Sequence, residues 1–310
     1  MTARIVTLTV NPALDIASTA DAVRPTHKIR TRDERYDAGG GGVNVARVLH
    51  ALGGDVQALL LVGDVTGQLI GELLDAEHVA WRAVPIGGRT RISYTVHEVG
   101  GAEYRFVPPG PQVQDAEWRA LLDRLGTLDA DWIVASGSLP PGVPDDFYAR
   151  AARDAQANGR KFALDSSGAA LRAALGQGVD LLKLSLGELE FLQGRPVPDA
   201  AAQEREVTAL LKAGAARAIA VSLGGDGALL ATADGLWREA AAPVAVRSAV
   251  GAGDSFLAGL VLALAGNESA PHALRMGTAT AAVAVSQYGT ALVRREDVMA
   301  LYAQLAQTPQ

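Results

Sequence analysis

From residue 131 onward, short apolar runs alternate with longer amphipathic segments, and this rhythm limits the folds that the chain can adopt. Strands that alternate with helices indicate an α/β fold, with a mostly parallel central sheet and helices on both faces. A length of 310 residues suits one large domain of this class, or a domain with an appended subdomain. The predicted strands are 132–136, 162–165, 181–184 and 218–223, and the predicted helices are 145–158, 168–175, 186–193 and 200–214. Before them the sequence predicts strands at 57–62 and 79–85 with a helix at 66–76, and after them it predicts closing helices at 271–287 and 295–307.

Polar or glycine-rich residues follow each of these predicted strands. Ligands of open parallel sheets bind beyond the carboxyl ends of the strands, so the sequence predicts a site at this edge. The first strand, 3–10, leads into a predicted loop at 11–15. Asp15 in that loop either hydrogen-bonds a sugar hydroxyl or is a turn residue, and the second is the more common reason for an aspartate there. The four polar or glycine-rich segments that follow the strands begin at Ser136, Asp165, Lys183 and Ser222.

A glycine-rich turn, Gly251-Ala252-Gly253, precedes an apolar run at 256–264 that predicts a mostly buried helix. The unpaired N–H groups and the dipole at a helix start attract anions, most often phosphate. Asp254 repels such a ligand, so its carboxylate needs another purpose. It either caps the helix, the more common role for an isolated aspartate, or accepts a proton from a hydroxyl that attacks phosphorus.

A second glycine run, 39–42, precedes a helix with Val45, Val48, Leu49 and Leu52 on one face. Glycines that abut a patterned helix favour a backbone that passes close to a ligand over a flexible linker. The run is not a dinucleotide-binding fingerprint, because no hydrophobic strand leads into it and no acidic residue follows at the expected strand end.

Two further stretches predict a small sheet apart from the main one. Residues 28–37 are polar and partly alternating, while 90–98 and 102–107 alternate on either side of two glycines, as in a hairpin. Arg91 and Arg105 lie in this hairpin. Either one could meet a phosphate, although the surface is the usual place for any single arginine.

Composition excludes several classes of protein. The net charge is −6 with no basic cluster, which argues against a nucleic-acid partner. The chain has no cysteine, which rules out disulfides and thiol catalysis and fits a cytoplasmic location. The first residues lack a signal-peptide pattern, and the longest apolar run, 256–265, is too short to span a membrane. Walker-A, H-E-x-x-H and G-x-S-x-G motifs are missing from the sequence.

With both glycine motifs in view, the chain resembles the ribokinase-like (PfkB) family of carbohydrate kinases. Gly-Gly-Gly-Gly-Val-Asn44-Val-Ala-Arg is similar to its first signature, and Val-Gly-Ala-Gly-Asp254 to its second. Further similar blocks begin at Thr7, Ser136, Asp165 and Val221. Within the family, the chain is most similar to the phosphofructokinase and tagatose-6-phosphate kinase branch. The resemblance implies one ribokinase-like α/β domain over 1–310, with a β lid formed by about 28–38 and 88–108.

The resemblance also implies ATP-dependent phosphorylation of a ketohexose phosphate with Mg²⁺, foremost fructose 6-phosphate. Phosphorylation of fructose 1-phosphate or tagatose 6-phosphate is the alternative, and a non-catalytic sensor of sugar phosphate or nucleotide is a remote one. The implied partners are these small molecules and a second copy of the chain through the lid. Asp254 would be the base; Gly251, Ala252, Gly253 and Lys28 would assist the transfer; Asp15, Gly40, Gly41, Asn44, Arg91, Arg105 and Ser138 would bind the sugar phosphate; Lys183, Ser185, Ser222, Gly224, Gly227 and Ser248 would line the nucleotide site; and Glu188 would hold Mg²⁺ through water.

Two positions depart from the family pattern. Ser185 stands where the family usually has asparagine, and Ala249 stands where it commonly has threonine or serine. Neither change touches Asp254 or the glycines, so we expect a working kinase with weaker affinity for nucleotide or Mg²⁺.

Overall fold

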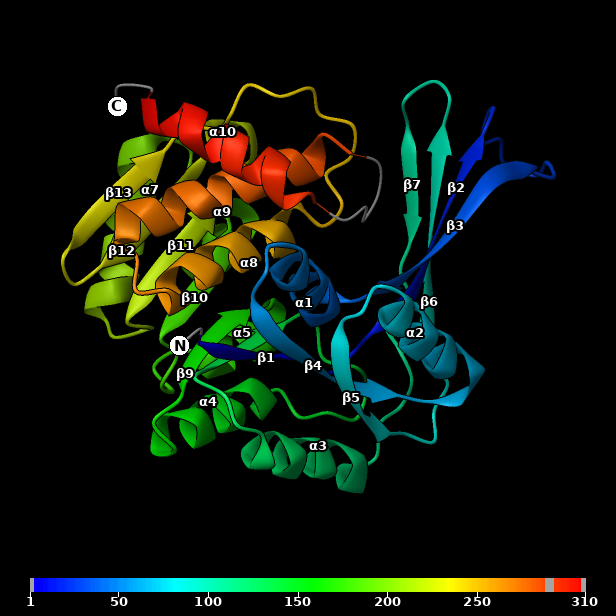
Figure 1. The fold of residues 1–310 in the computed structure, drawn as a ribbon, viewed down its shortest axis with the longest axis horizontal. Helices are drawn as coiled ribbons and strands as arrows, with labels where there is room; N and C mark the ends of the chain where they lie inside the picture. The colour runs from blue at the N-terminus through cyan, green and yellow to red at the C-terminus, as the bar shows by residue number, and fades with distance from the viewer. Residues whose placement is uncertain (1–2, 288–292, 308–310) are drawn as a thin grey trace.

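The computed structural model describes residues 3–287 and 293–307, and within them nine strands form one central sheet (Figure 1). The strand order is β13-β12-β11-β10-β9-β8-β1-β4-β5. All neighbours from β5 to β11 pair in parallel, and β12 and β13 add an antiparallel edge. The predicted α/β class, with a mostly parallel sheet, is therefore confirmed. The bounds are β1 Arg4–Thr9, β4 Asp55–Val62, β5 Ala80–Pro85, β8 Trp132–Ser136, β9 Lys161–Asp165, β10 Leu181–Ser185, β11 Ala218–Ser222, β12 Ala228–Thr232 and β13 Gly235–Glu239.

Helices cover both faces of this sheet, which explains why its strands are apolar on both sides. In β4, Leu59 and Leu61 enter one hydrophobic cluster, while Ala58 and Leu60 enter the other. Successive side chains of a strand point to opposite faces, so each strand supplies both cores. The face with Leu60 carries α1 Gly41–Ala51, α2 Asp64–Ala76, α8 Ala252–Ala265, α9 Ala270–Val285 and α10 Arg295–Gln307; the other carries α3 Asp115–Thr127, α4 Phe147–Ala157, α5 Gly168–Ala174, α6 Leu186–Gln193 and α7 Ala200–Lys212.

A second sheet of four strands, ordered β3-β2-β6-β7, projects from one end of the molecule (Figure 1). We call it the small sheet. It consists of β2 Ala13–Ala20, β3 Thr31–Gly39, β6 Arg91–Glu98 and β7 Glu103–Phe106. The central strand β2 pairs antiparallel with β3 and parallel with β6. Since β2 starts four residues after β1 ends, the small sheet continues directly from the central sheet.

The prediction of a loop at 11–15 is wrong from residue 13, where β2 begins. Ala13 and Leu14 are buried, and β3 and β6 hydrogen-bond the backbone on both sides. The sequence did not reveal this strand, because β2 consists largely of small and polar residues and its stability comes from pairing with strands that are distant in sequence.

Three other elements, α3, β12 and β13, have no counterpart among the predictions. The helix α8 also starts at Ala252, four residues before the apolar run that predicted it. The run marks only the buried part of the helix, whereas the backbone turn at Gly251 sets the start. Among the described residues, no helix is both long enough and apolar enough to span a membrane.

Candidate active site

A pocket of about 420 Å³ opens at the carboxyl ends of β8, β9 and β10, beside the start of α8. Arg105 reaches it from the small sheet, and Gly41 from the start of α1. The remaining lining residues are Ser136, Gly137, Ser138, Asp165, Ser166, Ser167, Lys183, Glu188, Gly251, Gly253 and Asp254. Segments separated by more than 200 residues thus meet at the sheet edge where the polar strand ends suggested a ligand site.

Gly251 is the residue at which the chain turns into α8. Its φ of 74° lies in the left-handed region, which glycine adopts without strain. Asp254 follows in the first turn, and its side chain does not cap the helix in the described structure. The capping interpretation of Asp254 is therefore wrong. The first N–H groups of α8 have no partners within the helix, although the Ala252 N–H donates to the Ala249 carbonyl at 3.4 Å, and a carboxylate stands beside them.

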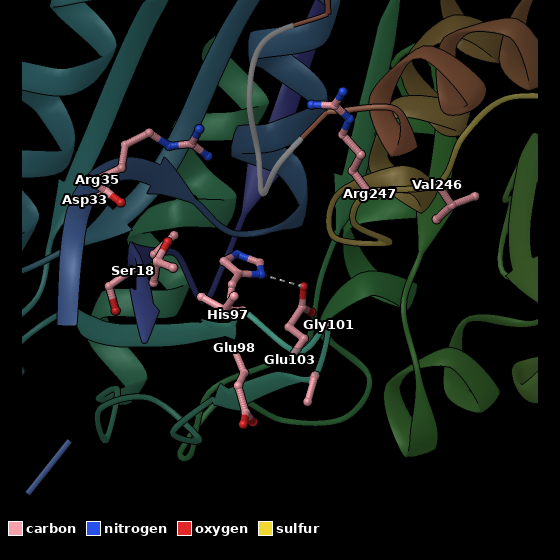
Figure 2. Close-up of a pocket in the computed structure, with 13 residues that line it drawn as sticks. Ser18, Asp33, Arg35, His97, Glu98, Gly101, Glu103, Val246 and Arg247 are labelled. Carbon is pink, nitrogen blue, oxygen red and sulfur yellow. Dashed lines mark ion pairs between the residues drawn. The ribbon is translucent and has the colours of Figure 1, made fainter. Parts of the chain in front are cut away.

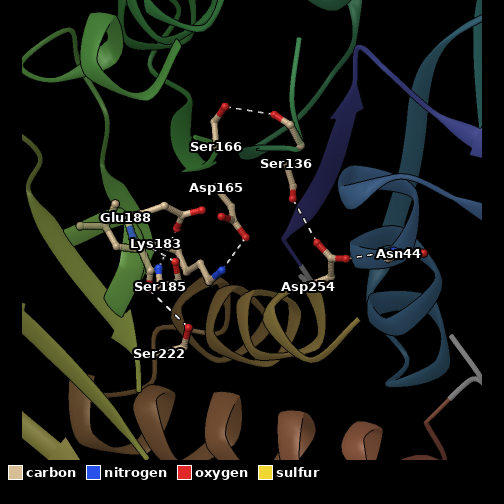
Figure 3. A network of polar contacts seen from close by, with 11 residues as sticks. Asn44, Ser136, Asp165, Ser166, Lys183, Ser185, Glu188, Ser222 and Asp254 are labelled. Carbon is tan, nitrogen blue, oxygen red and sulfur yellow. Dashed lines mark hydrogen bonds and ion pairs between the residues drawn. The ribbon is translucent and has the colours of Figure 1, made fainter. Parts of the chain in front are cut away.

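Two hydrogen bonds hold the Asp254 carboxylate from other elements (Figure 3). The Asn44 side-chain amide on α1 donates to Oδ2 at 2.9 Å, and the Ser136 hydroxyl at the end of β8 donates to Oδ1 at 3.1 Å. Burial raises the pKa of Asp254 to about 6, and the negative charge of Asp165 adds to this rise. The Asn44 bond, the charge of Lys183 and the Ser136 bond act in the opposite direction. A carboxyl with this pKa can take up a proton near neutral pH.

Lys183 and Asp165 form a buried ion pair beside this carboxylate. The Nζ–Oδ2 distance is 2.9 Å, and both side chains are largely enclosed (Figure 3). Burial lowers the pKa of Lys183, but the charge and hydrogen bond of Asp165, together with the charges of Glu188 and Asp254, outweigh that effect, so the net pKa is raised and the ammonium stays charged. A Cβ added to Gly253 would lie 2.9 Å from Nζ, so glycine at this position lets the lysine approach the start of α8.

Ser185 and Glu188 form a capping box at the start of α6. The Ser185 N–H donates to Glu188 Oε2 at 2.7 Å, and the Glu188 N–H donates to Ser185 Oγ at 3.2 Å. Serine is a favoured residue for this motif, so the departure at Ser185 has a local structural role. Glu188 still lines the pocket.

The described residues contain no cluster of three or more side chains that could hold a metal by themselves. Mg²⁺ bound with nucleotide needs only one or two carboxylates, because waters and phosphate oxygens complete its coordination. Asp165 and Glu188 offer such carboxylates on the pocket wall, so the residues fit this ion.

Asp15 lies on β2, on the face of the small sheet that also carries Arg105. Burial raises the pKa of Asp15 to about 6, while the charge of Arg91 opposes the rise. The Arg91 guanidinium donates to the carbonyl oxygens of Pro108 and Asn11, at 2.9 Å each. Asn11 in turn donates to Ser138 Oγ at 3.3 Å. Arg91 is thereby held near Ser138, which lines the pocket.

Several predicted site residues lie outside the lining of this pocket. Lys28 is exposed in the segment between β2 and β3. Gly40 precedes α1, and a Cβ there would lie 2.9 Å from Pro12 Cα. Ser222, Gly224 and Gly227 follow β11; Ser222 donates to the Leu184 carbonyl at 3.4 Å.

Ser248 also lies outside the pocket lining, and it contacts Glu103, a residue that lines a second hollow of about 710 Å³ (Figure 2). This hollow lies between the small sheet and the segment with Val246 and Arg247. The Ser248 hydroxyl donates to Glu103 at 3.3 Å, and Glu103 also pairs with His97 at 3.4 Å. Ser248 therefore connects the segment that leads into α8 with the small sheet.

Two residues of the pocket, Ser136 and Asp165, had no predicted role. Each is the last residue of a strand, and the signals in the sequence were that position and the family-like blocks that begin at these two residues. Their partners, Asp254 and Lys183, lie 118 and 18 residues away. Sequence spacing therefore pointed to the sheet edge but not to these contacts.

Comparison with known proteins places this geometry in context. Residues 9–296 match the profile of the pfkB family of carbohydrate kinases. The chain is 43% identical over 298 residues to the ATP-dependent 6-phosphofructokinase isozyme 2 of Mycobacterium tuberculosis, covering 95% of this chain and 88% of that protein. It is 34% identical to the 1-phosphofructokinase of Escherichia coli strain K12, covering 100% and 99%. A crystal structure of Escherichia coli phosphofructokinase-2 in complex with fructose-6-phosphate superposes with a TM-score of 0.93, at 34% identity, over 98% of this chain and all of that chain.

Proposed function

The chain belongs to the pfkB family of carbohydrate kinases, and we propose that it transfers the γ-phosphoryl group of ATP to fructose 6-phosphate, giving fructose 1,6-bisphosphate and ADP. The observation that carries the proposal is the position of Asp254. Its carboxylate lies in the first turn of α8, beside N–H groups that have no partner within the helix, and burial raises its pKa to about 6. A base and an anion site thus share one pocket, as phosphoryl transfer to an alcohol requires.

In the proposed reaction, the C1 hydroxyl of the sugar attacks the γ-phosphorus in line with the leaving oxygen of ADP. The new C1–O–P bond forms as the old P–O bond breaks, and the hydroxyl proton passes to the Asp254 carboxylate. Phosphoryl transfer depends mainly on positioning and on stabilisation of charge. Asn44 and Ser136, which fix the carboxylate, supply part of that positioning.

The start of α8 and Lys183 are the proposed stabilisers of negative charge. The N–H groups of Gly251, Ala252 and Gly253 would face the transferring phosphoryl group, where their preorganised dipoles cost no rearrangement. Lys183 would add a full positive charge next to Gly253. Mg²⁺ held near Asp165 and Glu188 would neutralise phosphate charge when the nucleotide is bound. The proposed nucleotide-binding side of the site consists of Ser185, Ser222, Gly224, Gly227 and Ser248.

The opposite side of the pocket is the proposed sugar-phosphate site. Asn44 Oδ1 is buried and has no hydrogen-bond partner in the part of the chain that the structure describes, so it can accept from a sugar hydroxyl. The Asp15 carboxylate would be a second acceptor, and the backbone of Gly40 and Gly41 would pass close to the sugar. The sugar phosphate would bind Arg91, Arg105 and Ser138. Lys28 would join them from the segment between β2 and β3, where it is exposed.

A second candidate substrate is fructose 1-phosphate, which the similarity to Escherichia coli 1-phosphofructokinase favours. Release of ADP from Mg-ATP, measured with fructose 6-phosphate, fructose 1-phosphate and tagatose 6-phosphate, tests the choice through kcat/KM. The proposal requires fructose 6-phosphate to give the highest value. A higher value for either other sugar would reassign the substrate, and saturable sugar binding without ADP release would indicate a sensor.

We also propose that the small sheet acts as the lid and as the contact for a second copy of the chain. Asp15, Ser93 and Asp37 share the face that also carries Arg105, a lining residue of the pocket, so the next residues in each strand form the opposite face. That opposite face carries apolar side chains exposed by 39 to 58%. They are Tyr36, Ile92 and Phe106.

A further inference from the structure

We propose that Ser136 is a positioning residue that orients the Asp254 carboxylate and stabilises its charged form. This inference rests on the proposed function, in which Asp254 is the base. Ser136 ends β8, which lies between β1 and β9 in the central sheet. Only 2% of the residue is exposed, and its hydroxyl donates to Asp254 Oδ1 at 3.1 Å. The donor is therefore held at the end of a buried strand inside the central sheet.

Gly41 explains how the Ser136 hydroxyl comes to occupy this place. A Cβ built on Gly41 would lie 2.2 Å from Ser136 Oγ, closer than any real contact. It would also lie 2.8 Å from the Ser136 carbonyl carbon and 3.0 Å from Gly137 N. A side chain at position 41 would push the hydroxyl away from Asp254. The glycine of the first motif thus makes room for Ser136 as well as for a ligand.

The two donors to Asp254 differ in one chemical property. The Asn44 amide nitrogen can only donate, whereas a serine hydroxyl can donate or accept. When the sugar hydroxyl gives up its proton to Oδ1, the Ser136 O–H can rotate and accept a hydrogen bond from the new carboxyl O–H. Asn44 meanwhile keeps its bond to Oδ2. Contact with Ser136 is thus preserved in both protonation states of the base.

Other charged groups also face Asp254, so the test must isolate the contribution of Ser136. Asp165 raises the pKa of Asp254, and Lys183 lowers it. Arg105 and Glu188 line the same pocket. Replacing Ser136 with alanine leaves all four charges in place and removes one donor to the carboxylate.

The experiment measures kcat/KM for fructose 6-phosphate against pH in Ser136→Ala and in a matched control, Ser166→Ala. Ser166 is similarly buried, lines the same pocket and donates to the Gly137 carbonyl rather than to Asp254. Loss of the Ser136 bond should raise the pKa of Asp254, so the acid limb should move up by about one pH unit. At a pH below this limb, kcat/KM should fall about tenfold. The limb should not move in Ser166→Ala.

An acid limb that stays in place in Ser136→Ala, or an equal loss of kcat/KM at every pH, overturns the inference. If Ser136→Ala does not fold, Gly41→Ala is the second variant, because its added Cβ would displace the Ser136 hydroxyl from Asp254. The acid limb of kcat/KM must then move in Gly41→Ala as well. The variant Asp254→Asn separates the hypothesis that Asp254 is the base from the hypothesis that Ser136 positions it. An active Asp254→Asn refutes the assignment of Asp254 as the base, on which this inference rests, whereas an inactive one with an unmoved limb in Ser136→Ala refutes only the role of Ser136.

Discussion

Lys183 Nζ and Asp165 Oδ2 lie 2.9 Å apart on directly paired residues of β10 and β9. Both line the pocket of Asp254, and each alters its pKa in the opposite direction. The pair therefore acts as a unit: the lysine brings positive charge to the start of α8, and the aspartate limits how far that charge lowers the pKa of Asp254. Breaking a buried pair leaves one charge without compensation, which is costly.

The role of Asp254 is tested by Asp254→Asn. The amide cannot accept the hydroxyl proton as a carboxylate does, so kcat should fall about 10²- to 10⁴-fold. Turnover is measured as ADP release with saturating Mg-ATP and fructose 6-phosphate. Circular dichroism and the thermal midpoint should match the parent. Activity within a few-fold of the parent would show that Asp254 is not the base.

The acid limb of kcat/KM is expected near pH 6, because both Asp254 and Asp15 have pKa values raised to about 6. The base works when deprotonated, so activity should be lost as the pH falls through this value. Asp165→Asn removes a negative neighbour, which lowers the pKa of Asp254 and should move its titration to lower pH. The pH profile of Asp154→Asn, on the exposed side of α4, serves as the control.

Asp165→Asn should also lower the stability of the fold. The substitution leaves the buried Lys183 ammonium without its anionic partner, at a cost of about 3 kcal/mol in the free energy of unfolding. Denaturant unfolding measures this change. A loss below about 1 kcal/mol would mean that Lys183 finds other compensation, such as Glu188 or Asp254.

We expect Arg47 to connect the small sheet with the helices that pack on the central sheet. Its guanidinium is buried; it contacts Glu77 at the end of α2, donates to the Ala38 carbonyl in β3 at 3.3 Å and lies 3.6 Å from Asp37. Arg47→Met should lower the free energy of unfolding by about 3 kcal/mol. It should also raise KM for the sugar phosphate more than KM for ATP.

The matched control for Arg47→Met is Arg294→Met, which removes an exposed ion pair with Glu296. Exposed pairs contribute about 0 to 1 kcal/mol, so stability should barely change. Equal losses in both variants would contradict a special role for Arg47.

The proposed dimer predicts that Phe106→Asp sediments as a monomer. Phe106 is 58% exposed on the face of the small sheet that points away from the pocket, and a carboxylate there would oppose burial against a second copy. Val65→Asp, at a similarly exposed site on α2, should leave the assembly unchanged. Sedimentation velocity distinguishes the species. A monomeric parent, or a Phe106→Asp variant that remains dimeric, would refute the contact.

Sequence patterns predicted the α/β class and most helices because these depend on local apolar periodicity. Strand β4, for example, is apolar on both sides, and this pattern is visible in the chain itself. Strand β2 was missed because its pairing partners, not its composition, make it a strand. Strands β12 and β13 pair with each other across a short turn, yet they had no strong alternation to reveal them.

The motifs located the candidate site more reliably than they assigned its contacts. The glycines at 251 and 253 correctly indicated a helix start at the sheet edge. The prediction that Asn44 binds sugar did not include its bond to Asp254, 210 residues away. Such a bond depends on how α1 and α8 pack against each other, and no pattern within either segment encodes it.

The small sheet is built from two separate stretches of chain, 13–39 and 91–106, that enclose α1, β4, α2 and β5 between them. It cannot be excised or exchanged as a single cassette, and a tilt of β2 or β3 necessarily displaces Asp15 or the glycines that open α1. If the small sheet is the lid that we propose, one structural unit both covers the sugar and binds it, so an engineer who reshapes either function will alter both.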